Sequence, residues 1–212
     1  MHGNGRAAWR RRTVPRKVDH DARRREIADA LLRLATTEGL ESVSLRHVAA
    51  EAGISMGAVQ HYFRSKDDML AFAFEYQSQR HGQRIAEKLG AAGRPPTVRE
   101  ILRTTIMEVL PTDEESRAAW LAGIAFFIRA MSDARMAAVV AGGGPKLIEF
   151  FAEHLDRARS AGELPSGVDP RQEATIVWAL IDSQATAIVL GGRTAAEAVD
   201  TVDYHLDRLF RG

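Results

Sequence analysis

The chain has 212 residues, of which 45% are hydrophobic and 27% charged, and its formal net charge is +1 at pH 7. This length and apolar content suit one or two domains with a sizeable core and exclude a chain that is disordered throughout. The chain has no cysteine, which excludes disulfides, thiolate catalysis and cysteine-ligated metals. We expect a soluble globular protein of the cytoplasm.

Positive charge is concentrated at the N-terminus. Residues 1–25 contain nine arginine or lysine residues and two aspartates, a local charge of +7 that leaves −6 for the remainder. We interpret residues 1–20 as a disordered basic arm that neutralises phosphates or enters a minor groove. The alternative is a tail that only increases solubility. The segment lacks the apolar stretch of a signal peptide, and Asp182, Ser183 and Gln184 interrupt the most apolar later run, so we expect no membrane span.

The first periodic segment predicts a helix over residues 21–38. Apolar residues recur on one face of it at helical spacing, and Gly39 follows its last turn. These apolar residues are Ile27, Ala30, Leu31, Leu34 and Ala35. We expect this helix to support the two that follow.

Residues 44–66, SLRHVAAEAGISMGAVQHYFRSK, predict two short helices joined by a glycine turn. Ser44 and Ser55 each stand where a hydroxyl can cap a helix. Gly53 stands where the backbone needs a positive φ, and Ile54 follows it toward the core. This pattern is typical of a helix-turn-helix and predicts a DNA-binding domain over residues 21–66.

Residues 53–63, GISMGAVQHYF, followed by Lys66, resemble the recognition segment of the TetR/AcrR family of bacterial transcriptional regulators. Residues 169–192 also resemble the BetI-type ligand-binding half of that family. The chain differs from the family pattern at two positions. Gln60 replaces a common tyrosine, and His47 replaces an acidic residue that often completes a capping box. A glutamine amide can pair with adenine, whereas a phenol mostly meets phosphate.

The resemblance implies how the helix-turn-helix contacts DNA. Ser44 and Arg46 would reach the duplex from the supporting helix, and Tyr62 and Lys66 would hold phosphates. The residues expected to face the major groove are Ser55, Met56, Gly57, Gln60 and His61.

Capping signals divide the rest of the chain into further helices. A long helix begins after Ser65 and runs to about Leu89, and others begin at Thr97 and Thr112, each with a glutamate three residues later. The helix after Thr112 has the most regular apolar pattern, so we expect it to be mostly buried. Its apolar residues are Trp120, Leu121, Ile124, Phe127, Ile128 and Met131.

A glycine-proline break at residues 142–145 interrupts what would otherwise be one helix from Asp133 to Ala161. We expect a kink or a short loop there. The resemblance allows a ligand portal at this point, and the alternative, which we favour, is a plain surface connection.

The last two helices are expected at about residues 170–190 and 194–210. Their starts are marked by Asp169 with Pro170 and by Thr194 with Glu197. Both carry more apolar surface than one buried stripe needs, which favours a four-helix bundle with the same helices of a second copy. In the resembled family this is the dimer interface. Such a dimer matches a palindromic operator with half-sites roughly 34 to 36 Å apart.

The resemblance further implies that residues 67–212 form a helical domain for effector binding and dimerisation. Ordinary core packing is the alternative for the apolar candidates, and a hydrogen-bonded core group or a place at the dimer interface is the alternative for His154 and Asp182. The candidate ligand-pocket residues are Met107, Trp120, Phe127, Met131, Phe150, His154, Trp178 and Asp182.

These patterns predict an all-α protein with an N-terminal three-helix helix-turn-helix domain and a C-terminal antiparallel helical domain. We expect a ligand-responsive, sequence-specific, homodimeric regulator, a repressor released from double-stranded DNA by a small molecule, without a cofactor or metal. The alternative is a helical dimer that binds DNA non-specifically or serves as an interaction module. Because no catalytic motif is present, we do not expect an enzyme.

Overall fold

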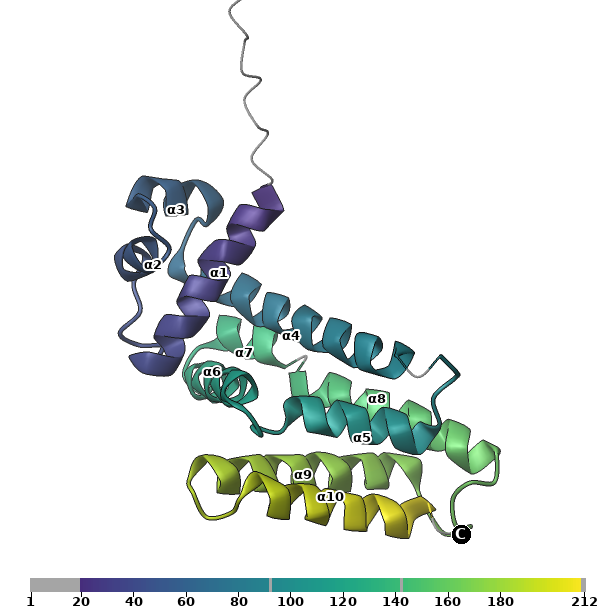
Figure 1. Ribbon diagram of the computed structural model, residues 1–212. Coiled ribbons are helices and arrows are strands. Elements are labelled where there is room, and N and C mark those ends of the chain that lie inside the picture. Colours follow the sequence, from purple (N-terminus) through teal and green to yellow (C-terminus); the bar gives the residue numbers. More distant parts are fainter. Residues whose placement is uncertain (1–19, 92, 142, 211–212) are drawn as a thin grey trace, which may run out of the picture.

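The computed structural model describes residues 20–91, 93–141 and 143–210, and over these ranges it contains ten helices and no strand. The predicted all-α class is therefore confirmed. The predicted basic arm lies outside the described residues apart from His20, where the first helix begins. Three helices form what we call the N-terminal unit, residues 20–63, at one end of the molecule (Figure 1). They are α1 (His20–Thr37), α2 (Leu45–Glu51) and α3 (Met56–Tyr62).

The long helix α4 (Lys66–Gly90) leads from the N-terminal unit into the rest of the molecule. In Figure 1 the last two helices form a layer at the end farthest from α3, with α5 and α8 between that layer and α4. The remaining helices are α5 (Val98–Val109), α6 (Glu114–Ala130), α7 (Ala134–Val140), α8 (Gly143–Ser160), α9 (Pro170–Val189) and α10 (Ala195–Phe210).

Side-chain caps begin the helices of the N-terminal unit as the sequence predicts. Ser44 accepts a hydrogen bond from the His47 amide at 3.2 Å, and Ser55 accepts one from the Ala58 amide at 3.1 Å. Between the two helices Gly53 has a φ of +66°, a conformation that costs other residues energy. The chain can therefore turn within a few residues and place α3 across α2.

The predicted start of α6 is wrong by one residue. Asp113, and not Thr112, is the cap: its carboxylate accepts from the Ser116 amide at 2.7 Å, and the Ser116 hydroxyl accepts from the Asp113 amide at 3.1 Å. The sequence contains both possible cap pairs, Thr112 with Glu115 and Asp113 with Ser116. The ionised carboxylate of Asp113 is the stronger acceptor for the free amides of a helix start.

Two apolar cores hold the molecule together. One joins the N-terminal unit to the start of α4 and also includes Ala122 and Phe126 of α6 and Met136 of α7. The other joins α5, α8, α9 and α10. The first core therefore extends beyond residues 21–66, the range predicted as the DNA-binding domain, and makes α6 and α7 part of its support.

The prediction that the apolar stripe of α6 is mostly buried is wrong. The buried residues of α6 include Ala122 and Phe126, which face α1 and α4, whereas the side chains of Phe127, Ile128 and Met131 are 58%, 60% and 76% exposed. A periodic apolar pattern indicates which residues share a face of a helix. It does not indicate whether another element covers that face.

Candidate functional site: a recognition helix and a large cavity

Helix α3 packs its inner face into the core of the N-terminal unit and leaves its outer face exposed. Val59 is fully buried, and Phe63, directly after the helix, is 1% exposed. The residues predicted to face the major groove, Ser55, Met56, Gly57, Gln60 and His61, are all exposed. Arg46 on α2 is also exposed, and Ser44 is half-buried because its hydroxyl caps α2. The predicted reading residues thus share one accessible surface.

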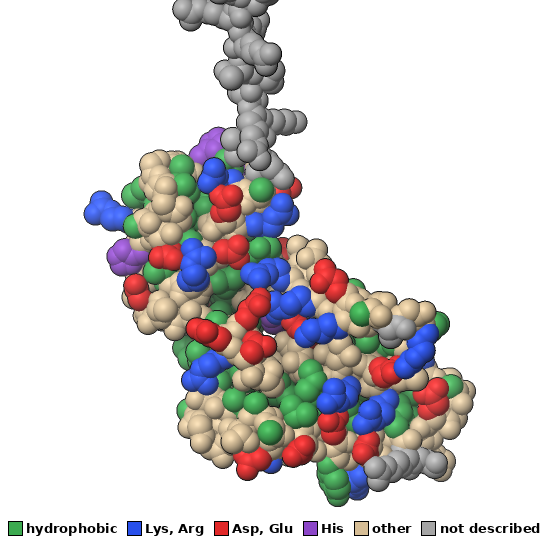
Figure 2. Space-filling model, in the orientation of Figure 1, with side chains coloured by type: hydrophobic (Ala, Val, Ile, Leu, Met, Phe, Trp, Pro, Cys, Tyr) green, Lys and Arg blue, Asp and Glu red, His purple; other side chains and the backbone are tan. Residues whose placement is uncertain are grey.

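An aromatic cluster joins the start of α1 to the end of α3. The ring centroids of His20 and Tyr62 are 4.8 Å apart, and those of His61 and Tyr62 are 5.1 Å apart. Figure 2 shows arginine or lysine and histidine side chains on the outer side of this unit. Because His20 packs against the end of α3, the basic residues 1–19 join the described chain beside the recognition helix.

The side chain of Lys66 bonds to the protein backbone, although the sequence analysis assigned it to a DNA phosphate. Its Nζ donates to the Leu40 carbonyl at 3.0 Å and to the Glu41 carbonyl at 3.3 Å, and the residue is half-buried. Burial lowers the pKa of this ammonium, which Glu41 partly opposes. The ammonium therefore ties the start of α4 to the loop before α2. This placement corrects the prediction that Lys66 holds a phosphate.

A cavity of about 1160 Å³ lies between α4, α5, α6, α7, α8 and α9. Six of the eight predicted pocket residues line it: Trp120, Phe127, Phe150, His154, Trp178 and Asp182. The other two predictions are wrong. Met107 packs against the second core, on the other side of α5, and Met131 ends α6 with its side chain 76% exposed. Helical spacing alone did not reveal that these two residues point elsewhere.

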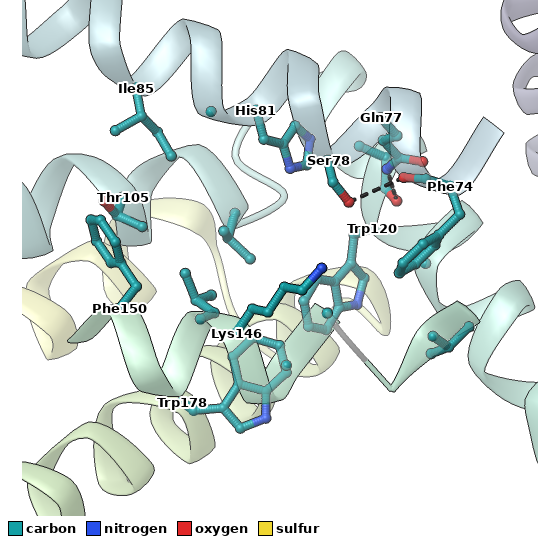
Figure 3. A pocket seen from close by; sticks show the side chains of 18 of the residues that line it. Phe74, Gln77, Ser78, His81, Ile85, Thr105, Trp120, Lys146, Phe150 and Trp178 are labelled. Carbon is teal, nitrogen blue, oxygen red and sulfur yellow. Dashed lines mark hydrogen bonds between the residues drawn. The ribbon is translucent and has the colours of Figure 1, made fainter. Parts of the chain in front are cut away.

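The cavity wall from α4 was missed by sequence analysis. Phe74, Gln77, Ser78, His81 and Ile85 all line the cavity (Figure 3). The spacing of four between residues 77, 81 and 85 places them on one helix face, and this is the signal that could have found them. The wall combines aromatic, aliphatic and polar groups.

Three buried polar atoms at this wall have no hydrogen-bond partner among the described residues. They are Gln77 Oε1, His81 Nε2 and Trp120 Nε1. The Gln77 amide nitrogen is already used, because it donates to the Ala119 carbonyl at 2.8 Å. An unpaired buried polar group costs about 1–3 kcal/mol. Burial, and then the nearby positive charge of Arg84, lowers the pKa of His81, so the imidazole is neutral at pH 7.

Two glycines let α8 approach the aromatic walls closely. A Cβ on Gly143 would lie 3.3 Å from the Phe74 ring, and one on Gly144 would lie 3.2 Å from the Trp178 indole. Helix α7 ends at Val140 and α8 begins at Gly143, so the connection between them is short, as the sequence predicts, and Gly143 and Gly144 at the start of α8 line the cavity.

Ion pairs connect α4 to α1, α5 and α6, where Figure 2 shows charges of both signs close together. Arg80 contacts Asp29 of α1 at 3.2 Å and Glu115 of α6 at 3.0 Å. Glu108 of α5, whose side chain is 4% exposed, pairs with Arg84 and with Lys88. Burial opposes its charge, but the hydrogen bonds from Lys88 and Arg84 hold the pKa of Glu108 below its ordinary value.

Gln77 and His81 also line a second, smaller cavity of about 310 Å³ between α1, α4 and α6. The same two side chains thus lie between the large cavity and the α1 interface. At the far end of α6, Arg129 contacts Glu41 at 3.3 Å and Asp67 at 3.1 Å. Helix α6 therefore lines the cavity and also contacts the N-terminal unit, through Ala122 and Phe126 in the shared core and through the ion pair of Arg129 with Glu41.

Two family models match the chain. Residues 27–72 match the model for bacterial regulatory proteins of the tetR family. Residues 98–211, more than half of the chain, match the C-terminal model of the BetI-type transcriptional repressors. The chain belongs to the TetR family of bacterial transcriptional regulators. It is therefore a DNA-binding transcriptional regulator, and the predicted family resemblance is confirmed.

Relatives of this TetR-family chain cover most of its length. It is 31% identical to the regulator PksA of Bacillus subtilis over 182 residues, 84% of this chain and 83% of the relative. It is 28% identical to the regulator BetI of Burkholderia ambifaria over 192 residues, 89% and 91% of the two chains. A regulator from Saccharomonospora viridis, solved in complex with choline, has the same fold, with a TM-score of 0.78, 20% identity, and coverage of 88% and 96%.

The two TetR-family matches leave residues 73–97 uncovered. This interval contains most of the cavity wall from α4, including Gln77 and His81. Within the described residues, no cluster of three or more histidines or carboxylates could hold a metal ion. Nor does that part of the chain have a helix with the length and apolarity that a membrane crossing requires.

Proposed function

We propose that this TetR-family chain is a homodimeric repressor that binds a palindromic operator and leaves it when a small organic molecule occupies the cavity. The observation that carries the proposal is the double role of α6. One face packs Phe126 into the core of the N-terminal unit, and another presents Trp120 and Phe127 to the cavity. A ligand that moves α6 would move the unit that reads DNA.

The proposed DNA contacts follow the exposed face of α3. Gln60 reads a base in the major groove, where its amide can pair bidentately with adenine. Arg46 and Ser44 contact the duplex from α2, and Tyr62 contacts a phosphate. Lys66 has a positioning role through its bonds to the Leu40 and Glu41 carbonyls. The other residues assigned to the major groove are Ser55, Met56, Gly57 and His61.

The basic residues 1–19 are proposed to add a second contact with the same duplex. Their attachment at His20, beside the end of α3, favours this role over that of a solubilising tail. Neutralised phosphates release counterions, so binding through this segment weakens with salt. Removing residues 2–18 should make the affinity for DNA less dependent on salt concentration.

The dimer is proposed to form through α9 and α10. Three large apolar side chains on these helices or directly after α9 are exposed: Ile176 at 51%, Leu190 at 79% and Tyr204 at 64%. Pairing with the same helices of a second copy would cover them and form a two-fold symmetric four-helix bundle. The same two-fold axis would relate two copies of α3 across a palindrome.

We further infer that the chain acts in the cytoplasm as a regulator and catalyses no reaction. Its relatives are transcriptional regulators, and the cavity combines apolar walls with few polar groups, as a binding site does. The choline of the Saccharomonospora viridis structure belongs to that protein.

The proposed reading role is tested by Gln60→Ala, with the exposed Gln83→Ala on α4 as the matched control. Affinity is measured at physiological salt for a duplex selected from a random library and for an unrelated duplex. Loss of a bidentate base contact corresponds to about 1–3 kcal/mol, so Gln60→Ala should weaken selected binding about 5- to 150-fold and change unrelated binding little. Equal losses on both duplexes would exclude base reading by Gln60. Equal wild-type affinity for both would favour a non-specific DNA-binding dimer.

A further inference from the structure

We propose that Arg24 is a further DNA contact of this chain: its guanidinium, held over two aromatic rings, binds a backbone phosphate beside the end of the recognition helix α3. This inference rests on the proposed function, in which α3 reads the duplex. It adds a residue of α1, outside the helix-turn-helix pair, to the DNA-binding surface, and it assigns that residue to the part of binding that does not depend on sequence.

Two aromatic rings determine the position of the Arg24 guanidinium. Its central carbon, Cζ, lies 4.8 Å from the centroid of the Phe63 ring and 4.1 Å from that of the Phe72 ring. The two rings also contact each other, with centroids 5.5 Å apart, and Phe63 is buried. A cation over an aromatic face is attracted by the ring. The guanidinium is therefore held where α1 meets the end of α3 and the early turns of α4.

The guanidinium has no polar partner within the described part of the chain. Its Nε atom is buried and unpaired, and the side chain forms no hydrogen bond or ion pair with another described residue. The terminal nitrogens Nη1 and Nη2 are not enclosed in this way, so an anion can reach them. Two other arginines of the same helix are paired: Arg23 contacts Glu26 at 2.6 Å, and Arg33 contacts Glu51 at 2.7 Å. Arg24 is thus a cation that is partly removed from water without an anion to compensate it.

Arg24 lies next to the DNA-reading surface. Residues four apart share a helix face, so Arg24 follows His20 on one side of α1. The His20 ring centroid lies 4.8 Å from that of Tyr62 and 6.4 Å from that of His61. Arg24 itself lies over Phe63, the residue directly after Tyr62. In Figure 1 this end of α1 lies beside α3, and a helical side chain leans toward the N-terminus of its helix.

A phosphate suits this guanidinium better than a base edge. Its adjacent N–H donors match two phosphate oxygens, and the two rings restrict its movement, so little side-chain freedom is lost on binding. Because it packs on Phe63, on the inner side of α3, it is set back from the residues that face the groove. The phosphate backbone flanks the groove, and contacts to it carry no sequence information directly. Binding through Arg24 is therefore expected on any duplex.

The alternative is a structural role, in which Arg24 only joins α1 to α3 and α4 through the two rings. Both roles predict a loss of stability when the side chain is changed, so stability alone does not separate them. The dependence of DNA affinity on salt does separate them, because a phosphate contact releases counterions and a packing contact within the protein does not.

The test measures the affinity of the full chain for a selected and an unrelated duplex between about 50 and 200 mM salt. Arg24→Met keeps an apolar side chain over the rings and removes the charge, whereas Arg24→Lys keeps the charge and loses the planar fork. The matched control is Arg135→Met, which removes an exposed cation of α7, outside the N-terminal unit. Urea unfolding checks that each variant is folded under the binding conditions, and Arg24→Gln replaces Arg24→Met if that variant is not.

Arg24→Met should weaken binding to both duplexes by the same factor, at least about tenfold, since a charged hydrogen bond contributes on this scale. The slope of log affinity against log salt should become shallower by about 0.9 for each contact, and so by about 1.8 for the two copies of a dimer. Arg24→Lys should retain most of the slope, and Arg135→Met should match the wild type.

Three results would overturn the inference and leave Arg24 without a phosphate contact. They are a wild-type slope in Arg24→Met, a slope in Arg24→Lys or Arg135→Met as shallow as that of Arg24→Met, and a loss confined to the selected duplex. Each of these leaves the proposed function intact. That function fails separately, if the wild-type chain binds the selected and the unrelated duplex with equal affinity.

Discussion

The N-terminal unit and the large cavity are built in different ways. The unit is assembled from neighbours in sequence: Ser44 and Ser55 cap its helices, Gly53 turns the chain, and the DNA contacts proposed for α2 and α3 all lie within residues 44–62. The cavity is assembled from six helices across more than one hundred residues. Its wall leaves Gln77, His81 and Trp120 with unpaired polar atoms. Signals between neighbouring residues thus determine the surface that is proposed to contact DNA. Packing between distant helices forms the cavity, whose unpaired polar atoms a ligand can bond.

The largest effect is expected where the two regions share a core. Phe126→Ala should lower the free energy of unfolding by about 3–5 kcal/mol, because Phe126 is fully buried between α6 and the N-terminal unit. The adjacent Phe127, 58% exposed, is the matched control, and Phe127→Ala should cost no more than about 1 kcal/mol. Urea unfolding at one fixed protein concentration measures both. Similar losses would mean that α6 does not join the two regions as described.

A smaller loss is expected from the ion pairs that hold α5 to α4. Glu108→Gln should destabilise the protein by about 1–3 kcal/mol, because it removes the charged partner of Lys88 and one of the two carboxylate partners of Arg84, which keeps Glu115. The estimate is below that for a fully buried pair because the Lys88 side chain is 58% exposed. Glu153→Gln on the exposed face of α8 should change stability little. Thermal unfolding of the two variants provides the comparison, and equal midpoints would contradict a stabilising role for Glu108.

Two glycine substitutions should have opposite signs. Gly53→Ala should destabilise the protein by about 1–2 kcal/mol, because Gly53 has a φ of +66°. Gly82→Ala should stabilise it by about 0.5–1 kcal/mol, because Gly82 lies in the interior of α4 with open space around a new Cβ. Urea unfolding distinguishes the signs. A stabilising Gly53→Ala would show that the turn of the N-terminal unit is less constrained than the backbone indicates.

The smallest effect concerns pH and the cavity wall. The pKa of His81 is lowered in the folded protein by burial and by Arg84, so the unfolded chain binds its proton more readily. Stability should therefore be unaffected by His81 above its ordinary pKa of about 6.5 and should fall as the pH decreases below it. His81→Asn removes this contribution. Unfolding midpoints measured from pH 7.5 down to about 5.5 should fall more in the wild type than in the variant, and parallel curves would contradict a buried neutral imidazole.

The sequence predicted the local features of the N-terminal unit better than the long-range contacts that form the cavity. The helices, the caps at Ser44, Ser55 and Thr97, and the positive φ of Gly53 depend on a few adjacent residues, and all were predicted correctly. The exception among the caps was Asp113, where two capping spacings overlap and the stronger acceptor prevails.

The misses come from contacts between distant parts of the chain. Lys66 was assigned to a phosphate because sequence could not show that the Leu40 carbonyl lies within its reach. Met131 was placed in the pocket and the α6 stripe in the core because periodicity does not say what covers a face. Gln77 and His81 were missed because polar residues on a long helix are usually solvated, and only packing against α6 reveals that they line a cavity.

The central claim is that a dimer of this chain reads a specific sequence through α3. The most direct test is selection of DNA from a random library by the purified full chain at physiological salt. The account predicts a palindrome whose half-site centres lie about one helical turn, roughly 34–36 Å, apart. A pool without a shared sequence, whose binding declines steeply with salt, would contradict it.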